Sequence, residues 1–167
     1  MSAFKFISPT AMQPVSVVAT APQFPLGLQA QAVDPTLGAA VFQYVQGSTN
    51  AAGMPVIIQG NTAKALATAV NNGSAAPVGI APAAMTATNQ YGWVQVQGVC
   101  DYAVAAVALG VGNQMLVPVN ATSGISTAAA GSVAVALRIM NITPVSSASA
   151  STTAGVLALN YPFYPGA

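Results

Sequence analysis

The chain has 167 residues, enough for one domain, and only five of its side chains are charged at neutral pH: Lys5, Asp34, Lys64, Asp101 and Arg138. An ordinary soluble domain of this length carries about 40 charged residues, a quarter of the total. A net charge of +1 offers no basic surface for a phosphate backbone, so the composition argues against nucleic-acid binding. Low charge also removes the repulsion that keeps protein molecules apart, which favours a chain that lies against other protein.

A membrane span is not expected either, although 54% of the residues are apolar. The longest uncharged candidate, residues 102–119, is rich in alanine and is interrupted by Gly110, Gly112 and Pro118. A spanning helix needs about 20 predominantly apolar residues. Near the N-terminus, Pro9 and Pro14 break the apolar core that a secretory signal requires. We therefore expect synthesis in the cytoplasm and no membrane partner.

The first 35 residues are punctuated by prolines, which resist helix interiors and central strands. We expect residues 1–35 to form an extended N-terminal arm or a chain of short edge pieces. The β-rich domain is predicted over residues 36–160, followed by an aromatic C-terminal tail over residues 161–167. The prolines stand at positions Pro9, Pro14, Pro22, Pro25 and Pro35.

From Gly38 onward apolar and polar residues alternate with a period of two, the pattern of strands. Val41–Gln46 and Pro55–Gln59 are the first two predicted strands. Gly60-Asn61 follows directly and is a two-residue hairpin signal. Residues 62–70 (TAKALATAV) are compatible with a short helix, but the preceding hairpin signal favours a strand.

The later strands are short and separated by Gly, Pro and Asn. Within the strand at 92–100, Val94 and Val96 should point to one face and Trp93 to the other. Residues 146–154 (SSASASTTA) are low-complexity and predict a loop. The pattern predicts an all-β antiparallel sandwich or barrel of about seven or eight short strands with extended N- and C-terminal arms. The later strands are expected at residues 78–84, 92–100, 115–119, 132–140 and 156–160.

Groups for acid–base catalysis are scarce, because the chain has neither histidine nor glutamate. Asp34 precedes Pro35, where its expected role is to accept hydrogen bonds from backbone amides in a turn. Cys100 and Asp101 are adjacent, so on a strand their side chains point to opposite faces and cannot cooperate. No spacing of Cys, Asp, Glu or His predicts a metal site. We expect a protein without a cofactor that is not an enzyme.

Aromatic side chains are the strongest candidates for an interface with another protein, because such rings contribute most where they are buried. Trp93 and the tyrosines could form a stacking platform for sugars, or Trp93 could anchor a core or a subunit interface. The interface candidates are Phe42, Tyr44, Tyr91, Trp93, Tyr161, Phe163 and Tyr164.

Three stretches in this order resemble the capsid decoration, or cement, proteins of tailed bacteriophages: residues 34–47 (DPTLGAAVFQYVQG), 77–85 (PVGIAPAAM) and 91–98 (YGWVQVQG). That family often pairs a "G-V-A" strand with a "G-W-V-Q-V-x-G" strand, followed by an Ala/Val segment and a "G-D"-like turn. Gly112-Asn113 would be that last turn and departs from the pattern. The resemblance covers about residues 34–140. It implies a β-rich domain, often trimeric, that binds the outside of an expanded capsid and clamps neighbouring subunits, with no catalytic residues.

The leading hypothesis is thus a virion structural protein on the capsid exterior that binds the major capsid protein and forms a homo-oligomer, with a trimer favoured. One alternative is a β-sandwich adhesin or spike domain that binds a glycan through Trp93 and the tyrosine-rich tail. Another is a self-assembling fibre or tube subunit, which has the same structural role with a different symmetry.

Overall fold

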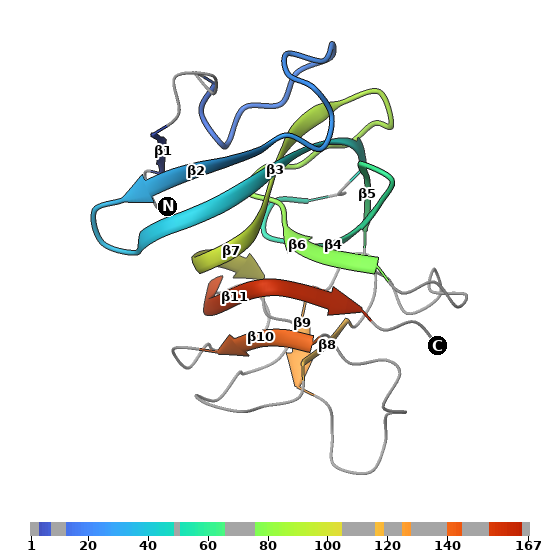
Figure 1. The fold of residues 1–167 in the computed structure, drawn as a ribbon. Coiled ribbons are helices and arrows are strands. Elements are labelled where there is room, and N and C mark those ends of the chain that lie inside the picture. Colours follow the sequence, from blue (N-terminus) through green and yellow to red (C-terminus); the bar gives the residue numbers. More distant parts are fainter. Residues whose placement is uncertain are drawn as a thin grey trace.

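The computed structural model describes residues 4–7, 13–48, 51–65, 76–104, 116–118, 125–127, 140–144 and 154–164. Every regular element in these residues is a strand, which confirms the predicted all-β class (Figure 1). The described part has eleven strands, more than predicted, and the longest of them, β7, has 14 residues. The strands are β1 (Lys5–Phe6), β2 (Gln29–Asp34), β3 (Gly38–Ser48), β4 (Pro55–Gln59), β5 (Thr62–Ala65), β6 (Ala76–Ile80), β7 (Tyr91–Val104), β8 (Leu116–Pro118), β9 (Ile125–Thr127), β10 (Met140–Pro144) and β11 (Ala154–Tyr164).

The main sheet closes on itself into a barrel. Strand β3 pairs with β5 on one side and with β7 on the other, and β4 and β6 complete the ring. The β3–β5 pairing is parallel, whereas the other pairings of the ring are antiparallel. The closed ring makes the domain a barrel rather than a sandwich.

Alanine, valine and isoleucine side chains and one methionine fill the barrel. Gly79 of β6 packs so closely against β7 that a Cβ atom there would lie 2.3 Å from Val94 Cγ1. The predicted alternation in β7 is confirmed, since Val94 and Val96 lie in the barrel and Trp93 belongs to a separate outer cluster. The outer cluster consists of Phe4, Val15, Ala30, Ala32, Ala40, Phe42, Tyr44 and Trp93. The interior cluster consists of Val45, Val56, Ile58, Ala63, Ala81, Met85, Val94 and Val96.

The hairpin predicted at Gly60-Asn61 joins β4 to β5. Gln59 pairs with Thr62, and both central residues have positive φ, 53° at Gly60 and 70° at Asn61. Two consecutive left-handed residues match the twist of the flanking strands, which is why Gly and Asn favour such turns. The segment after the hairpin is strand β5 over Thr62–Ala65, so the strand interpretation is confirmed there; residues 66–70 lie outside the described residues.

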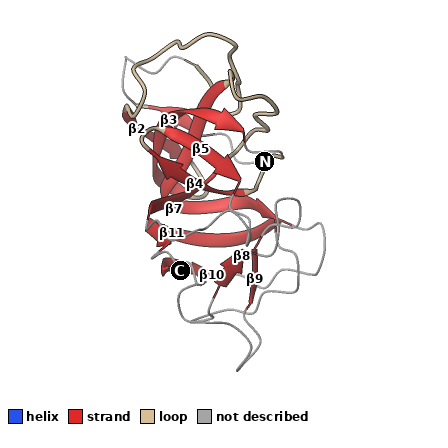
Figure 2. Ribbon diagram, turned by 90° about the vertical axis from the view of Figure 1, so that its right-hand side faces the viewer, coloured by secondary structure: helices blue, strands red, loops and turns tan. Residues whose placement is uncertain are grey.

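Further strands flank the ring on both sides. Strands β2 and β1 extend the sheet from β3, and β11 and β10 extend it from β7. Figure 2 shows β2 and β3 at one end of the molecule and β11 and β10 towards the other. The long strands β3 and β7 therefore belong both to the ring and to its extensions.

The segment expected as an N-terminal arm contributes to the domain itself. Strand β2 pairs with β3 over its whole length, and Phe4 and Val15 are buried in the outer cluster with Phe42 and Trp93. The prolines near residue 29 flank β2 without interrupting it, and its alanines alternate inward between exposed residues. The domain thus begins before residue 36, because this segment covers apolar surface that β3 and β7 would otherwise expose.

The expected C-terminal tail also needs correction, because Tyr161–Tyr164 continue strand β11. Phe163 pairs with Pro77 and Tyr164 with Ala76 of β6, so the strand is held beyond residue 160. Residues 146–153 of the loop predicted at 146–154, residues 165–167 and most of the predicted strand at 132–140 lie outside the described residues, and Ala154 begins β11. The predicted strand at 115–119 is found as β8, which pairs with β9 in a separate small sheet.

Asp34 has the turn role that its position before Pro35 predicts. Its Oδ1 accepts hydrogen bonds from the backbone amides of Thr36 at 2.7 Å and Leu37 at 3.0 Å. The side chain is buried at the turn from β2 to β3. This carboxylate therefore supports the hairpin between the two strands.

Candidate functional site

Three of the predicted interface residues lie in the core of the chain. Phe42, Tyr44 and Trp93 are at most 1% exposed, and Tyr91 packs partly buried against the same cluster. The N-terminal segment covers them, because Phe6 packs against Trp93 with ring centroids 4.6 Å apart and the ring centroid of Phe24 lies 5.4 Å from that of Trp93. These aromatic residues stabilise the fold, and Trp93 cannot form the surface platform that the adhesin hypothesis required.

Tyr161 is the one predicted aromatic candidate that the structure leaves open among those whose side chains it describes. Its side chain is 47% exposed, and its φ of 46° is in the left-handed region, which is uncommon for a residue with a Cβ atom. Phe163 and Tyr164 lie in β11, but their side chains are outside the described part.

Cys100 is a core residue without a reactive environment. It is fully buried in β7, and desolvation by burial raises the pKa of its thiol from 9.0 to about 12. The hydrogen bonds to the residues that follow oppose this rise only in part. Because the thiolate is the nucleophilic form, a thiol with this pKa is inert at neutral pH.

We expect the Cys100 thiol to resist an aromatic disulfide reagent in the native protein and to react at once in denaturant. Below pH 9 the thiol is neutral in both states; between about pH 9 and pH 12 only the unfolded chain loses the proton. Stability is therefore lost as pH rises through this window, by about 2 kcal/mol or more at pH 11. Urea unfolding at pH 8 and at pH 11 measures this loss of stability. The variant Cys100→Ala should show a smaller difference in the free energy of unfolding between the two pH values. A thiol that reacts in the native protein at pH 8 would contradict the assignment.

A buried amide holds β7 in its bent shape. The fully buried Gln95 donates hydrogen bonds from Nε2 to the carbonyl oxygens of Gln97 at 3.2 Å and Val99 at 3.0 Å. Its Oε1 accepts a hydrogen bond from the Tyr102 hydroxyl at 2.6 Å. The amide thus supplies hydrogen bonds to backbone carbonyl groups on both sides of Gly98. In a regular sheet a neighbouring strand would supply them.

Gly98 is the point at which β7 changes partner. Up to Gln97 the strand pairs with β3, with a register irregularity between Val41 and Phe42, and from Gln97 onward it pairs with β11. The φ of Gly98 is 97°, and a Cβ atom there would lie 2.6 Å from the carbonyl oxygen of Ala39. Only glycine fits this bend, because the left-handed conformation coincides with a close approach of two backbones.

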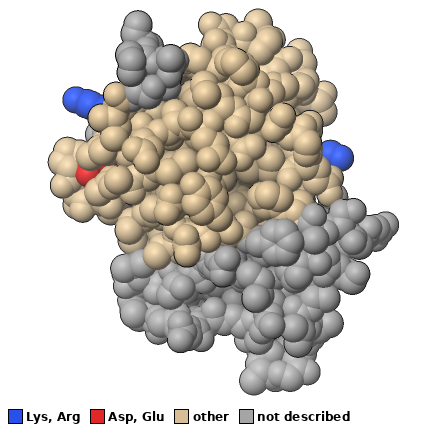
Figure 3. Space-filling view, viewed as in Figure 1, with Lys and Arg blue, Asp and Glu red and all other residues tan. Residues whose placement is uncertain are grey.

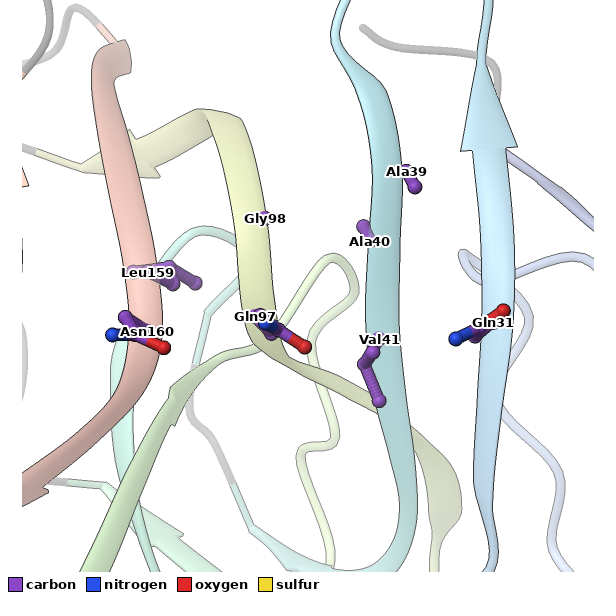
Figure 4. Close-up of a pocket in the computed structure, with 8 residues that line it drawn as sticks. All are labelled: Gln31, Ala39, Ala40, Val41, Gln97, Gly98, Leu159 and Asn160. Carbon is purple, nitrogen blue, oxygen red and sulfur yellow. The ribbon is translucent and has the colours of Figure 1, made fainter.

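Two neighbouring hollows lie where β7 leaves β3. The larger has a volume of about 390 Å³, and Figure 4 shows its lining residues on four separate strands. The smaller has a volume of about 250 Å³. Each includes a side chain that contacts the barrel interior, Val41 in the larger and Val96 in the smaller. The hollows therefore open at an end of the barrel, a common place for ligand sites.

The lining of both hollows is rich in amides and has no charged side chain. The sequence interpretation did not single out these amides, although the alternation of Gln29, Gln31 and the intervening alanines could have marked an exposed polar face. These amide side chains come together only because strands that are distant in the sequence pair with one another. The larger hollow is lined by Gln31, Ala39, Ala40, Val41, Gln97, Gly98, Leu159 and Asn160, and the smaller by Gln29, Gln43, Pro77, Val78, Val96, Tyr161 and Pro162.

Within the residues that the structure describes, no group of three or more His, Cys, Asp or Glu side chains is arranged to hold a metal ion. The same part of the chain contains no helix of the length and apolar character needed to cross a membrane. Comparison of the chain with models of known protein families, with curated proteins and with solved structures found no match.

Proposed function

We propose that the protein is a non-enzymatic structural component of a bacteriophage virion that binds the outer surface of the capsid and reinforces contacts between capsid subunits. The stretches that resemble decoration proteins include most of β3, part of β6 and the first half of β7, three strands of the barrel ring. The proposed partner is the major capsid protein, and the proposed assembly is a homotrimer made in the host cytoplasm and located on the virion exterior.

The exposed apolar residues of the N-terminal segment carry this proposal. Ile7, Val17 and Leu26 are 61%, 40% and 38% exposed, and no residue from Phe6 to Val33 carries a charge. The segment is also anchored, since Phe4 and Val15 are buried in the outer cluster. An uncharged segment with outward apolar side chains can be buried against another protein without the cost of desolvating a charge.

The low charge of the remaining surface is consistent with dense packing on a shell. Figure 3 shows a face on which charged side chains are few within the described part: two basic side chains lie at opposite sides, and one acidic patch lies near one of them. Many copies on one lattice would each add a modest contact, and together they would raise the barrier to rupture of the capsid.

The test mixes the purified protein with expanded phage capsids and measures co-sedimentation and the melting temperature of the shells. The wild-type chain should sediment with the shells and raise their melting temperature. The variant Ile7→Asp/Val17→Asp/Leu26→Asp should lose at least tenfold in affinity, because each change places a charge in the proposed contact. Gln59→Asp/Thr88→Asp/Asn89→Asp is the matched control: it adds the same three negative charges at exposed positions of other segments and should bind normally.

Circular dichroism of each variant establishes that the barrel is intact before binding is compared. Light scattering measures the oligomeric state, for which a trimer is expected. A strict monomer that never sediments with shells and leaves their melting temperature unchanged would refute the proposal. Filaments of the purified protein in electron micrographs would replace it with the fibre or tube alternative.

A further inference from the structure

Three amides at the end of the barrel lie in one line across four strands, and a valine occupies the fourth position of that line. Gln31 of β2 pairs with Val41 of β3, Val41 also pairs with Gln97 of β7, and Gln97 pairs with Asn160 of β11. Residues directly opposite each other in a sheet have side chains on the same face. We call the three amides Gln31, Gln97 and Asn160 the amide row; Figure 4 shows them on three strands, with Val41 of β3 between Gln31 and Gln97. With strands about 4.8 Å apart, the row is about 14 Å long.

The chemistry of the row suits a ligand that is polar but uncharged. Each carboxamide offers both a hydrogen-bond donor and an acceptor, and sugar hydroxyl groups require both. Neither hollow has a charged side chain in its lining, so nothing there would balance the charge of an anionic ligand. In the smaller hollow the amides of Gln29 and Gln43 lie on paired positions of β2 and β3 and extend the polar surface.

Tyr161 adds an aromatic ring beside the row. It follows Asn160 directly in β11, lines the smaller hollow and is 47% exposed. A half-exposed tyrosine has an apolar face and a polar tip, which suits packing against the C–H face of a sugar ring while hydroxyl groups bind to amides. The combination of amides and one exposed ring therefore points to a sugar ligand more specifically than a polar sheet face alone would.

A peptide strand is a poorer occupant for the same position. Recognition by strand addition needs an unpaired sheet edge whose backbone groups are free. Gln97 is paired with Val41 on one side and with Asn160 on the other, so the middle of the row offers side chains rather than a backbone edge.

From this arrangement we propose that the amide row and Tyr161 form a binding site for a neutral oligosaccharide. The site does not depend on the capsid role, because it uses other residues than the exposed apolar side chains of the N-terminal segment. Its length exceeds a single sugar ring, so a linear glycan of at least two residues is the expected ligand.

The test exposes the purified chain to an array of neutral and acidic glycans and measures the affinity for the strongest neutral oligosaccharide by calorimetry. Gln31→Ala/Asn160→Ala should weaken binding at least tenfold by removing the amides at both ends of the row. Tyr161→Ala should also weaken it at least tenfold. Gln59→Ala is the control, since Gln59 is an exposed amide at the end of β4 and does not line either hollow.

Melting curves verify that each variant is folded, which is expected because Gln31, Asn160 and Tyr161 are all exposed. Saturable binding of a neutral glycan that both variants weaken and the control retains would support the site. The proposal fails if no neutral glycan binds, if only acidic glycans bind, or if the double variant keeps the wild-type affinity.

Discussion

Replacement of Gln95 by leucine is expected to lower the free energy of unfolding by about 3 kcal/mol or more. The substitution places an apolar side chain of similar size in a fully buried position and removes three hydrogen bonds. The carbonyl oxygens of Gln97 and Val99 and the hydroxyl of Tyr102 would lose their partner, and each unsatisfied buried group costs about 1–3 kcal/mol. Urea denaturation followed by tryptophan fluorescence measures the change.

Gln31→Leu is the matched control for this substitution. Gln31 is an exposed amide on β2, so the same chemical change should alter stability by no more than about 0.5 kcal/mol. Equal effects of the two substitutions would mean that the buried network contributes nothing beyond the loss of an amide.

Gly98→Ala is expected to lower the free energy of unfolding by about 3 kcal/mol or more, the second large effect. The new methyl group would meet the carbonyl oxygen of Ala39 at 2.6 Å and Cα of Ala40 at 2.8 Å, and these backbone atoms cannot rotate away. The residue would also have to keep a φ of 97°, which residues with a Cβ atom rarely adopt. The steric contact and the backbone strain both act at the bend where β7 passes from β3 to β11.

Gly38→Ala separates the two terms. Gly38 has a φ of 80°, but a Cβ atom there would meet nothing within 4 Å. This control should therefore show only the cost of the left-handed backbone, about 1–2 kcal/mol. Thermal unfolding of Gly98→Ala and Gly38→Ala measures the difference in their stability. An equal loss of stability in both variants would show that the contact of the new methyl group with β3 costs nothing.

The two proposed surfaces lie on opposite faces of the β2–β3 hairpin, so one molecule can use both. Ala30 and Ala32 of β2 belong to the cluster that the N-terminal segment covers. Gln29 and Gln31 alternate with them and line the hollows. A molecule held on a shell through its N-terminal segment would therefore keep the amide row available for a ligand.

The misplaced interface residues show why burial is difficult to assign from one sequence. The sequence around Trp93 and Tyr44 would look the same whether these rings pack against a partner protein or against their own chain. Their neighbours in space, Phe6 and Phe24, come from a proline-rich segment with little strand pattern. The turn role of Asp34 and the Gly60-Asn61 hairpin were predictable, because both depend on contacts within a few residues.

The all-β class, the positions of several strands and the alternation of Val94 and Val96 with Trp93 could be predicted from the sequence, because they follow from local backbone preference and a period of two. The closure of the ring, the change of partner by β7 at Gly98 and the alignment of Gln31, Gln97 and Asn160 became visible only in the folded chain. Those features depend on strand pairings between residues far apart in the chain, and pairing energy resides in contacts that no local pattern encodes.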